Sequence, residues 1–389
     1  MNNQAFSWPA DALIGARKRT DELSDNFIAQ LTKEKSKEEL YGILQYLLNE
    51  YTFVNHEKLD PDMLAYYQEA SKLPDWVNYD QINIASKFFA VHGIEITMML
   101  LMKSLPATYA CGKGAEVVYS TGRMNSHGGN EKAFTRRLMQ TAKFVLNVLS
   151  EDALKPNGIG VKACAKVRAL HAFIRLYLQS MNWDEAKYDK PINQEDEAGT
   201  ILSFSVFVIE GMESLGVKVT QQEKDAYHHA WSVIAYLMGV EHTLIADSYE
   251  KAQKLGHYII GNQKSKSVAG ERLAAACVHF LQDLIPYRIL KFTPSHMIYF
   301  LIGPELSDML NIKRSGNFFV RFAFFMVKKI IRLYEWSKRH FAFVERWAIK
   351  NNPLLMDAMA RQFLKASKDT ESAKETAKEV SVVKENIKQ

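Results

Sequence analysis

The stretch that decides the fold is residues 161–181, VKACAKVRALHAFIRLYLQSM. Its apolar side chains recur every three or four residues, which is the repeat of one face of an α-helix. His171 lies beside this apolar stripe, with Arg168 three residues before it and Arg175 four residues after it. Side chains at these spacings project from one side of a helix, so the pattern predicts an imidazole between two guanidinium groups.

Two interpretations of this helix stay open on spacing alone. In the first, the neutral imidazole of His171 is the axial ligand of a haem iron, the arginines pair with the propionates, and Ile174 packs against the porphyrin. Neighbouring arginines would also lower the proton affinity of the imidazole and keep a ring nitrogen available to the metal. In the second, His171 is a hydrogen-bonded core residue and the two arginines form internal salt bridges.

A second helix is predicted upstream, at residues 132–149, KAFTRRLMQTAKFVLNVL. Arg137, Gln140, Thr141 and Phe144 share one of its faces. A cation, an amide and a hydroxyl on an otherwise apolar face are suited to orienting dioxygen over an iron, while the phenyl ring confines a substrate. The alternative is an ordinary amphipathic helix with its polar groups at the boundary of the core.

The helical repeat continues along the chain, with glycine and proline clustered between periodic segments and no strand alternation or hairpin signal. We therefore expect an all-α protein with a single large helical domain. The predicted helices are residues 20–32, 37–50, 61–72, 80–103, 132–150, 161–181, 195–215, 221–238, 246–255, 266–284, 317–349 and 353–366.

Composition excludes several classes of protein. The chain has 389 residues and a formal net charge of +5, and its 49 basic residues are mostly interleaved with 44 acidic ones. It shows no basic patch or motif of a nucleic-acid-binding protein. Three widely spaced cysteines give no disulfide or zinc framework, and the N-terminus lacks a secretory pattern, so we expect a cytoplasmic location. Cys164 is two turns from His171, roughly 10 Å along the axis, so only one of them would reach a given iron, and we favour His171.

The sequence resembles the catalytic domain of the latex-clearing protein (rubber oxygenase) family. This family includes the oxygenase of the mycophenolic-acid pathway. The resemblance covers roughly residues 10–310, and the Arg/His/Arg helix is its most specific part. The motifs that carry it are Arg137-x-x-Gln140-Thr141, Arg168-x-x-His171-x-x-x-Arg175, Leu105-Pro106, Thr121-Gly122-Arg123, Tyr227-x-x-x-Trp231, Gly239-Val240, and Asp21–Asp25 after Arg17 and Arg19.

The resemblance implies a globin-like helical core at residues 10–310 that binds one haem b without thioether links. It implies His171 as the proximal iron ligand, with Arg168 and Arg175 supporting the haem and its propionates. Arg137 and Thr141 fall at distal-pocket positions. Members of the family cleave carbon–carbon double bonds of isoprenoid chains with dioxygen, so the implied partners are O2 and a small unsaturated hydrophobic substrate.

One departure bears on the chemistry. Rubber-cleaving members carry a lysine where this chain has Gln140, and an amide donates a hydrogen bond but does not titrate. The distal chemistry is therefore expected to differ from that of the rubber-cleaving members. The N-terminus lacks a secretory pattern, and a cell cannot import a rubber particle, so a smaller isoprenoid or lipid is the expected substrate rather than polyisoprene. The neutral amide also favours an alternative function, a non-catalytic haem protein that senses or carries dioxygen or haem on the same fold.

The C-terminal quarter is expected to differ from the rest. Residues 311–364 predict helices, and the segment 317–351 is rich in phenylalanine and basic residues. Two interpretations stay open for it: a helix pair packed on the core, or a peripheral contact with a membrane surface. Residues 365–389 are polar and contain no aromatic residue, which predicts a disordered or loosely helical tail.

Overall fold

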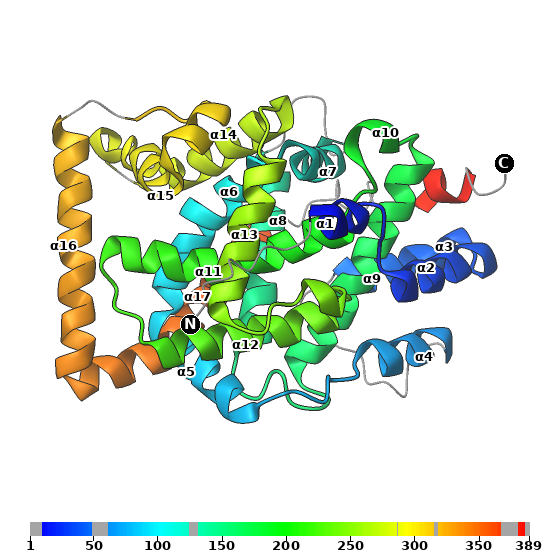
Figure 1. Ribbon diagram of the computed structural model, residues 1–389, viewed down its shortest axis with the longest axis horizontal. Helices are drawn as coiled ribbons and strands as arrows, with labels where there is room; N and C mark the ends of the chain where they lie inside the picture. Colours follow the sequence, from blue (N-terminus) through cyan, green and yellow to red (C-terminus); the bar gives the residue numbers. More distant parts are fainter. Residues whose placement is uncertain are drawn as a thin grey trace.

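The computed structural model describes residues 10–48, 61–123, 131–285, 287–314, 318–366 and 380–385. Within these ranges the protein is helical, and its one β feature is an isolated bridge between Cys111 and Lys264. The expected all-α class is confirmed (Figure 1). The long helices are α2 (Glu22–Glu34), α3 (Lys37–Leu48), α4 (Pro61–Ala70), α5 (Tyr79–Met99), α7 (Gly112–Arg123), α8 (Glu131–Leu149), α9 (Ile159–Ser180), α11 (Gln194–Leu215), α12 (Gln221–Leu237), α13 (Tyr249–Gln263), α14 (Val268–Asp283), α15 (Thr293–Met309), α16 (Phe318–His340) and α17 (Ala342–Ala366). Shorter helical elements are α1 (Ala10–Ala16), the π-helix η2 (Leu100–Ser104), α6 (Leu105–Tyr109), α10 (Glu185–Tyr188), and the 3-10 turns η3 (His242–Leu244) and η4 (Arg288–Leu290).

Several of these helices were not predicted, notably α7 and α15. Helix α7 begins with Gly112 and contains Gly114, and α15 contains Gly303 and Pro304, where the backbone turns out of helical geometry. Glycine and proline weaken a helical pattern in a sequence even where tertiary packing keeps the helix. The predicted break near residue 350 is also misplaced, because α16 ends at His340 and Pro353 lies inside α17.

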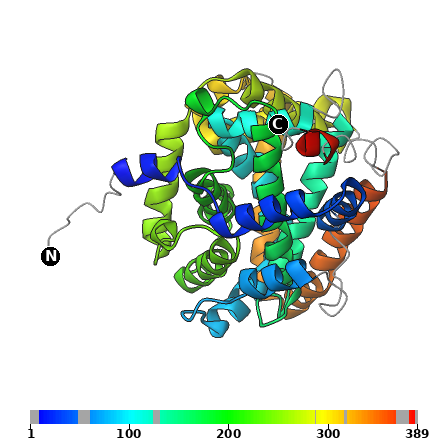
Figure 2. The ribbon, with the colours of Figure 1, turned by 90° about the vertical axis from the view of Figure 1, so that its right-hand side faces the viewer.

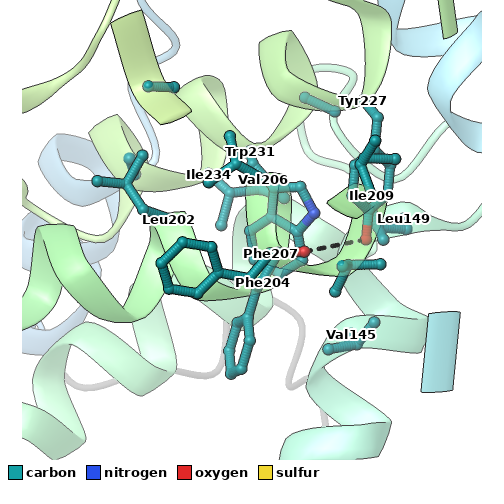
Figure 3. Close-up of a cluster of buried hydrophobic side chains, with 14 of the residues drawn as sticks. Val145, Leu149, Leu202, Phe204, Val206, Phe207, Ile209, Tyr227, Trp231 and Ile234 are labelled. Atoms are coloured by element: carbon teal, nitrogen blue, oxygen red, sulfur yellow. Dashed lines mark hydrogen bonds between the residues drawn. The ribbon is translucent and has the colours of Figure 1, made fainter. Parts of the chain in front are cut away.

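The main hydrophobic core is built around α11 and α12. Phe204, Phe207, Tyr227 and Trp231 fill it, and the Tyr227 hydroxyl donates to the Phe204 carbonyl over 3.2 Å (Figure 3). Trp231 is fully buried, and its ring centroid lies 5.4 Å from that of Phe204. Helices α5, α8, α9 and α13 supply the other apolar side chains of this core.

A second core joins the N-terminal helices to α9. Buried side chains from α2, α3 and α4 pack on Ala165, Ala169 and Phe173 of α9. Figure 2 shows the N-terminal helices, in blue, crossing the middle of this face of the molecule. Residues 380–385 are helical, and Val380 and Val383 are buried in the same core. The expectation of a disordered or loosely helical tail stays a prediction, because the structure describes only residues 365–366 and 380–385 of the segment 365–389. Helix α9 therefore lies between two cores.

Two described helical stretches are long and apolar enough to cross a membrane by composition alone: Tyr79–Tyr109 and Gln194–Leu215. Half of the first window and 72% of the second are buried inside the protein. Core helices of this kind pass the same test, and here they line the main core.

A buried charged cluster fastens α16 to α5. The Lys338 ammonium lies 2.6 Å from Glu335 and 3.0 Å from Glu95, and it also contacts His92, where α5 has non-helical backbone angles. Burial acts to raise the pKa of Glu335, but the hydrogen bond with His92 and the Lys338 charge lower it to about 2. Burial raises the pKa of Glu95. Asn352 of α17 donates to the Ala90 and Val91 carbonyls at the same bend.

We expect Lys338→Met to lower the free energy of unfolding by about 3–5 kcal/mol, because it leaves two buried carboxylates without their cation. Urea unfolding followed by circular dichroism measures this loss. The control is Lys329→Met, an exposed lysine of the same helix, which should stay within about 0.5 kcal/mol of the parent protein. Equal stability of the two variants would show that Lys338 does not neutralise this cluster.

Candidate functional site

Helices α8 and α9 form a hairpin that is closest at its turn. A Cβ on Gly160 would lie only 3.0 Å from the Val148 Cα and 2.9 Å from the Ala153 carbonyl oxygen, so glycine permits this approach. Arg137 lies roughly 16 Å from Val148 along α8, and His171 lies roughly 16 Å from Gly160 along α9, at a rise of about 1.5 Å per residue. The two predicted groups of site residues therefore lie at comparable distances from the turn.

The side chain of His171 is held by an acidic residue from another helix. Its Nδ1 lies 3.2 Å from a carboxylate oxygen of Glu197, in the first turn of α11. The imidazole is 30% exposed, whereas Glu197 is 6% exposed. Among the described residues this is the single hydrogen bond of the ring, so an Nδ1–H donated to Glu197 leaves the Nε2 lone pair available. A carboxylate on the remote nitrogen is the usual partner of a metal-binding histidine.

Glu197 is held in place by its own helix and neighbours. Asn193 caps α11 by accepting a hydrogen bond from the Asp196 backbone, which fixes the first turn. Arg17 binds the same turn, with distances of 3.1 Å to Glu195 and 2.9 Å to Asp196. Burial raises the pKa of both carboxyl groups, and the Arg17 charge opposes that shift. The N-terminal segment thus fixes the helix end that orients His171.

The two arginines of α9 face acidic residues of α2 and its N-cap. Arg168 makes a two-pronged pair with Asp21, at 2.6 and 2.7 Å, and Arg175 binds Asp25 at 2.6 Å. Arg175 also lies 3.5 Å from Glu197. The arginines were expected to pair directly with haem propionates. In the structure their guanidinium groups form internal salt bridges, as in the second interpretation of this helix. A buried cation requires such a counter-charge.

The α8 residues contact several elements. Arg137 donates to the Val118 carbonyl at 2.7 Å and to the Thr121 hydroxyl at 2.8 Å, both on α7. Gln140 donates to the Leu48 carbonyl at 3.5 Å, and Thr141 donates to the Arg137 carbonyl of its own helix. Phe144 is half-buried against the main core. In the described parts of the chain, none of these four side chains hydrogen-bonds to His171.

A stripe of incompletely buried side chains marks the site on both helices. On α9, Val167, Leu170 and Ile174 are half-buried on the side of His171, although α9 runs between two cores. On α8, the four predicted residues are half-buried as well. Buried Glu197 Oε2 and Arg175 Nη2 have no hydrogen-bond partner. The donor set suits a flat apolar cofactor with a metal: one free imidazole nitrogen, apolar neighbours and a carboxylate behind the ligand.

A second group of metal-ligand residue types lies on α5 and α16. Ligand atoms of His92, Glu95 and Glu335 lie within 4.8 Å of one another, and all three residues are buried. The ammonium of Lys338 contacts all three side chains. Because a fixed cation already occupies the centre of the cluster, we assign the cluster a structural role.

Glu197, Asp21 and Asp25 were not predicted as site residues. The sequence does carry a signal for them, because Glu195-Asp196-Glu197 opens an apolar helix and Asp21–Asp25 follows two arginines. Three acidic residues at the start of a buried helix predict that basic side chains pair with them. Which acid meets which base depends on the packing of distant segments.

The described part of the chain is all-helical, and a family model gives its class, an oxygenase. Residues 90–327 match the family model "ER-bound oxygenase mpaB/B'/Rubber oxygenase, catalytic domain". The chain belongs to this family. It is 25% identical over 259 residues to the rubber oxygenase of Streptomyces sp. (strain K30), a match that covers 66% of this chain and 62% of that protein. The structure of latex clearing protein LCP in the closed state superposes with a TM-score of 0.69 at 19% identity, covering 90% of this chain and 95% of that one.

We expect the Arg168–Asp21 pair to stabilise the site through its burial. Asp21→Asn keeps the size of the residue but removes the charge, so unfolding should become easier by about 3 kcal/mol. The Asp21 side chain makes no capping hydrogen bond to α2, so the lost charge is the change that this variant tests. Glu241→Gln is the matched control, because Glu241 binds Arg19 with the same two-pronged geometry at an exposed position. That change should cost less than about 1 kcal/mol. Similar losses in chemical denaturation would contradict the assignment.

Proposed function

We propose that this protein is a haem-b-dependent oxygenase that acts on an unsaturated hydrophobic substrate, of the isoprenoid or lipid class, with O2. The observation that carries the proposal is the His171–Glu197 pair, which presents one imidazole nitrogen on a half-buried apolar stripe. Family membership supports oxygenase chemistry in general terms. The haem, the substrate class and the reaction on this chain are our inference.

His171 would hold the iron of the haem through Nε2, and Glu197 would accept the Nδ1 proton. This hydrogen bond fixes the ring orientation and increases the basicity of the ligand nitrogen. When bound, the haem would supply the oxygen chemistry that side chains lack. Val167, Leu170 and Ile174 would pack against its face and exclude water. Arg168 and Arg175, engaged with Asp21 and Asp25, would position α9 rather than bind the propionates directly.

On α8, Gln140 and Thr141 would provide the polar groups for O2, and Phe144 would bound the substrate space. Gln140 remains a neutral donor at every pH of interest. The Arg137 guanidinium is engaged with α7, so its role would be to fix the angle between α7 and α8. No titrating lysine is available at position 140 to deliver a proton, so we infer a smaller isoprenoid or lipid substrate rather than a polymer.

The absorption spectrum of the purified protein tests the ligand. We expect a strong Soret band after expression with haem supplied, and its loss or large shift in His171→Ala. The control is His242→Ala, an exposed histidine whose removal should leave the spectrum unchanged. A full, unshifted Soret band in His171→Ala would contradict ligation by His171.

Product analysis distinguishes the oxygenase from the second candidate, a haem-binding sensor or carrier. The engagement of Gln140 and Arg137 with neighbouring helices is the observation that favours this candidate. We expect aerobic incubation of the haem-loaded protein with short isoprenoids to yield oxygenated products with O2 consumption, and His171→Ala to yield at least about 100-fold less, as for loss of an essential group. Reversible O2 binding without any product would support the sensor instead.

A further inference from the structure

Helix α16 exposes its apolar face to solvent. Phe318 is 72% exposed, Ile330 61%, Leu333 65% and Trp336 49%, and Phe322 lies between them at 52%. The same surface continues onto the start of α17, where two further aromatic side chains, Phe343 and Trp347, are 71% and 51% exposed. Large exposed apolar surfaces on a folded protein mark sites that interact with another protein or with a membrane.

The inner side of α16 carries both apolar and charged residues. Val320 is buried, and Phe324, Val327 and Ile331 pack against the main core. The same side buries Glu335 and Lys338, each only 4% exposed, in the charged cluster with Glu95. An amphipathic helix held by the hydrophobic effect alone would bury its aromatic residues and expose its charges. Apolar packing and buried ion pairs together fix the inner side of α16, and a second apolar face of the same helix stays exposed.

The charges on this helix have one sign where they meet solvent. Between residues 318 and 341 the single acidic residue is Glu335, which is buried. Arg321, Lys329, Arg332 and Arg339 are all in exposed positions. Successive members are eight, three and seven residues apart, which places them along one edge of the aromatic stripe. The exposed side of α16 is thus apolar and cationic.

We propose that the exposed face of α16, extended by Phe343 and Trp347, docks on the surface of a bilayer that contains anionic phospholipid. Aromatic and aliphatic side chains would insert among the headgroups, and the cations would pair with lipid phosphates. Figure 1 shows α16 at the left edge of the molecule, with its whole length on the outside. A symmetric contact with a second copy is less suited to this face, because it would bring the same cations together. The inference is independent of the proposed reaction.

Flotation of the full-length protein with vesicles tests this proposal. We expect binding to vesicles of phosphatidylcholine and phosphatidylserine, and binding at least about tenfold weaker to phosphatidylcholine alone or at high salt. Phe322→Ser with Leu333→Ser should weaken binding at least about tenfold by removing inserted apolar surface. Arg321→Glu with Lys329→Glu should do the same by reversing charge.

Ile14→Ser with Val268→Ser is the matched control, because it removes two side chains of 60% and 63% exposure from other helices. This variant should bind like the parent protein, and all variants should keep its urea midpoint. Two results would overturn the proposal directly: no binding to either vesicle, or equal binding by the Phe322/Leu333 variant and the parent protein. A third would be a dimer, detected by light scattering, that this variant abolishes in a protein that does not bind vesicles.

Discussion

The candidate site depends on one hydrogen bond, from His171 Nδ1 to Glu197 over 3.2 Å. It sets which imidazole nitrogen is protonated, and hence which one can bind a metal. The carboxylate is buried and its second oxygen has no hydrogen-bond partner, so its charge is directed at the ring and at Arg175. Because Glu197 lies in the first turn of α11, every contact that fixes that turn also fixes the imidazole. Arg17, Asn193 and the N-terminal segment therefore belong to the site even though they lie outside its apolar stripe.

The arginines of α9 show how the same residue types satisfy two different demands. A sequence with Arg168 and Arg175 around a histidine suggests groups that bind anionic ligands. In the folded chain the guanidinium groups pair with Asp21 and Asp25. These ion pairs offset the desolvation free energy of the two buried cations and hold α9 against α2 and its N-cap. The segment of α9 that carries His171 is thereby held against α2 about one turn before and one turn after the histidine. Precise placement of a ligand nitrogen requires this kind of outer support.

The sequence predicts those parts of the fold and site that depend on local periodicity. The α8 and α9 stripes and the all-helical class follow from spacings of three and four residues. The acidic partners do not, because Glu197 is 26 residues from His171, and Asp21 and Asp25 are 147 and 150 residues from their arginines. Such pairs are chosen by tertiary packing. Helices α7 and α15 were missed for a related reason. Glycine and proline weaken their sequence pattern, and both helices are stabilised by packing with α14, through buried residues such as Ala115, Ala274 and Ile298.

Helix α16 has apolar residues both on its side toward the core and on its exposed side. Periodicity correctly predicts an amphipathic helix there, but its charged side contains the residues that the core requires. Lys338 can be buried because Glu95 and Glu335 supply two carboxylates and His92 a ring nitrogen, while Asn352 satisfies the carbonyls freed by the bend in α5. This charged anchor acts together with the inward-facing Phe324, Val327 and Ile331, whereas Phe318, Phe322 and Leu333 are exposed. The fold does not explain why these apolar residues are exposed, whereas docking on a bilayer that contains anionic phospholipid explains it.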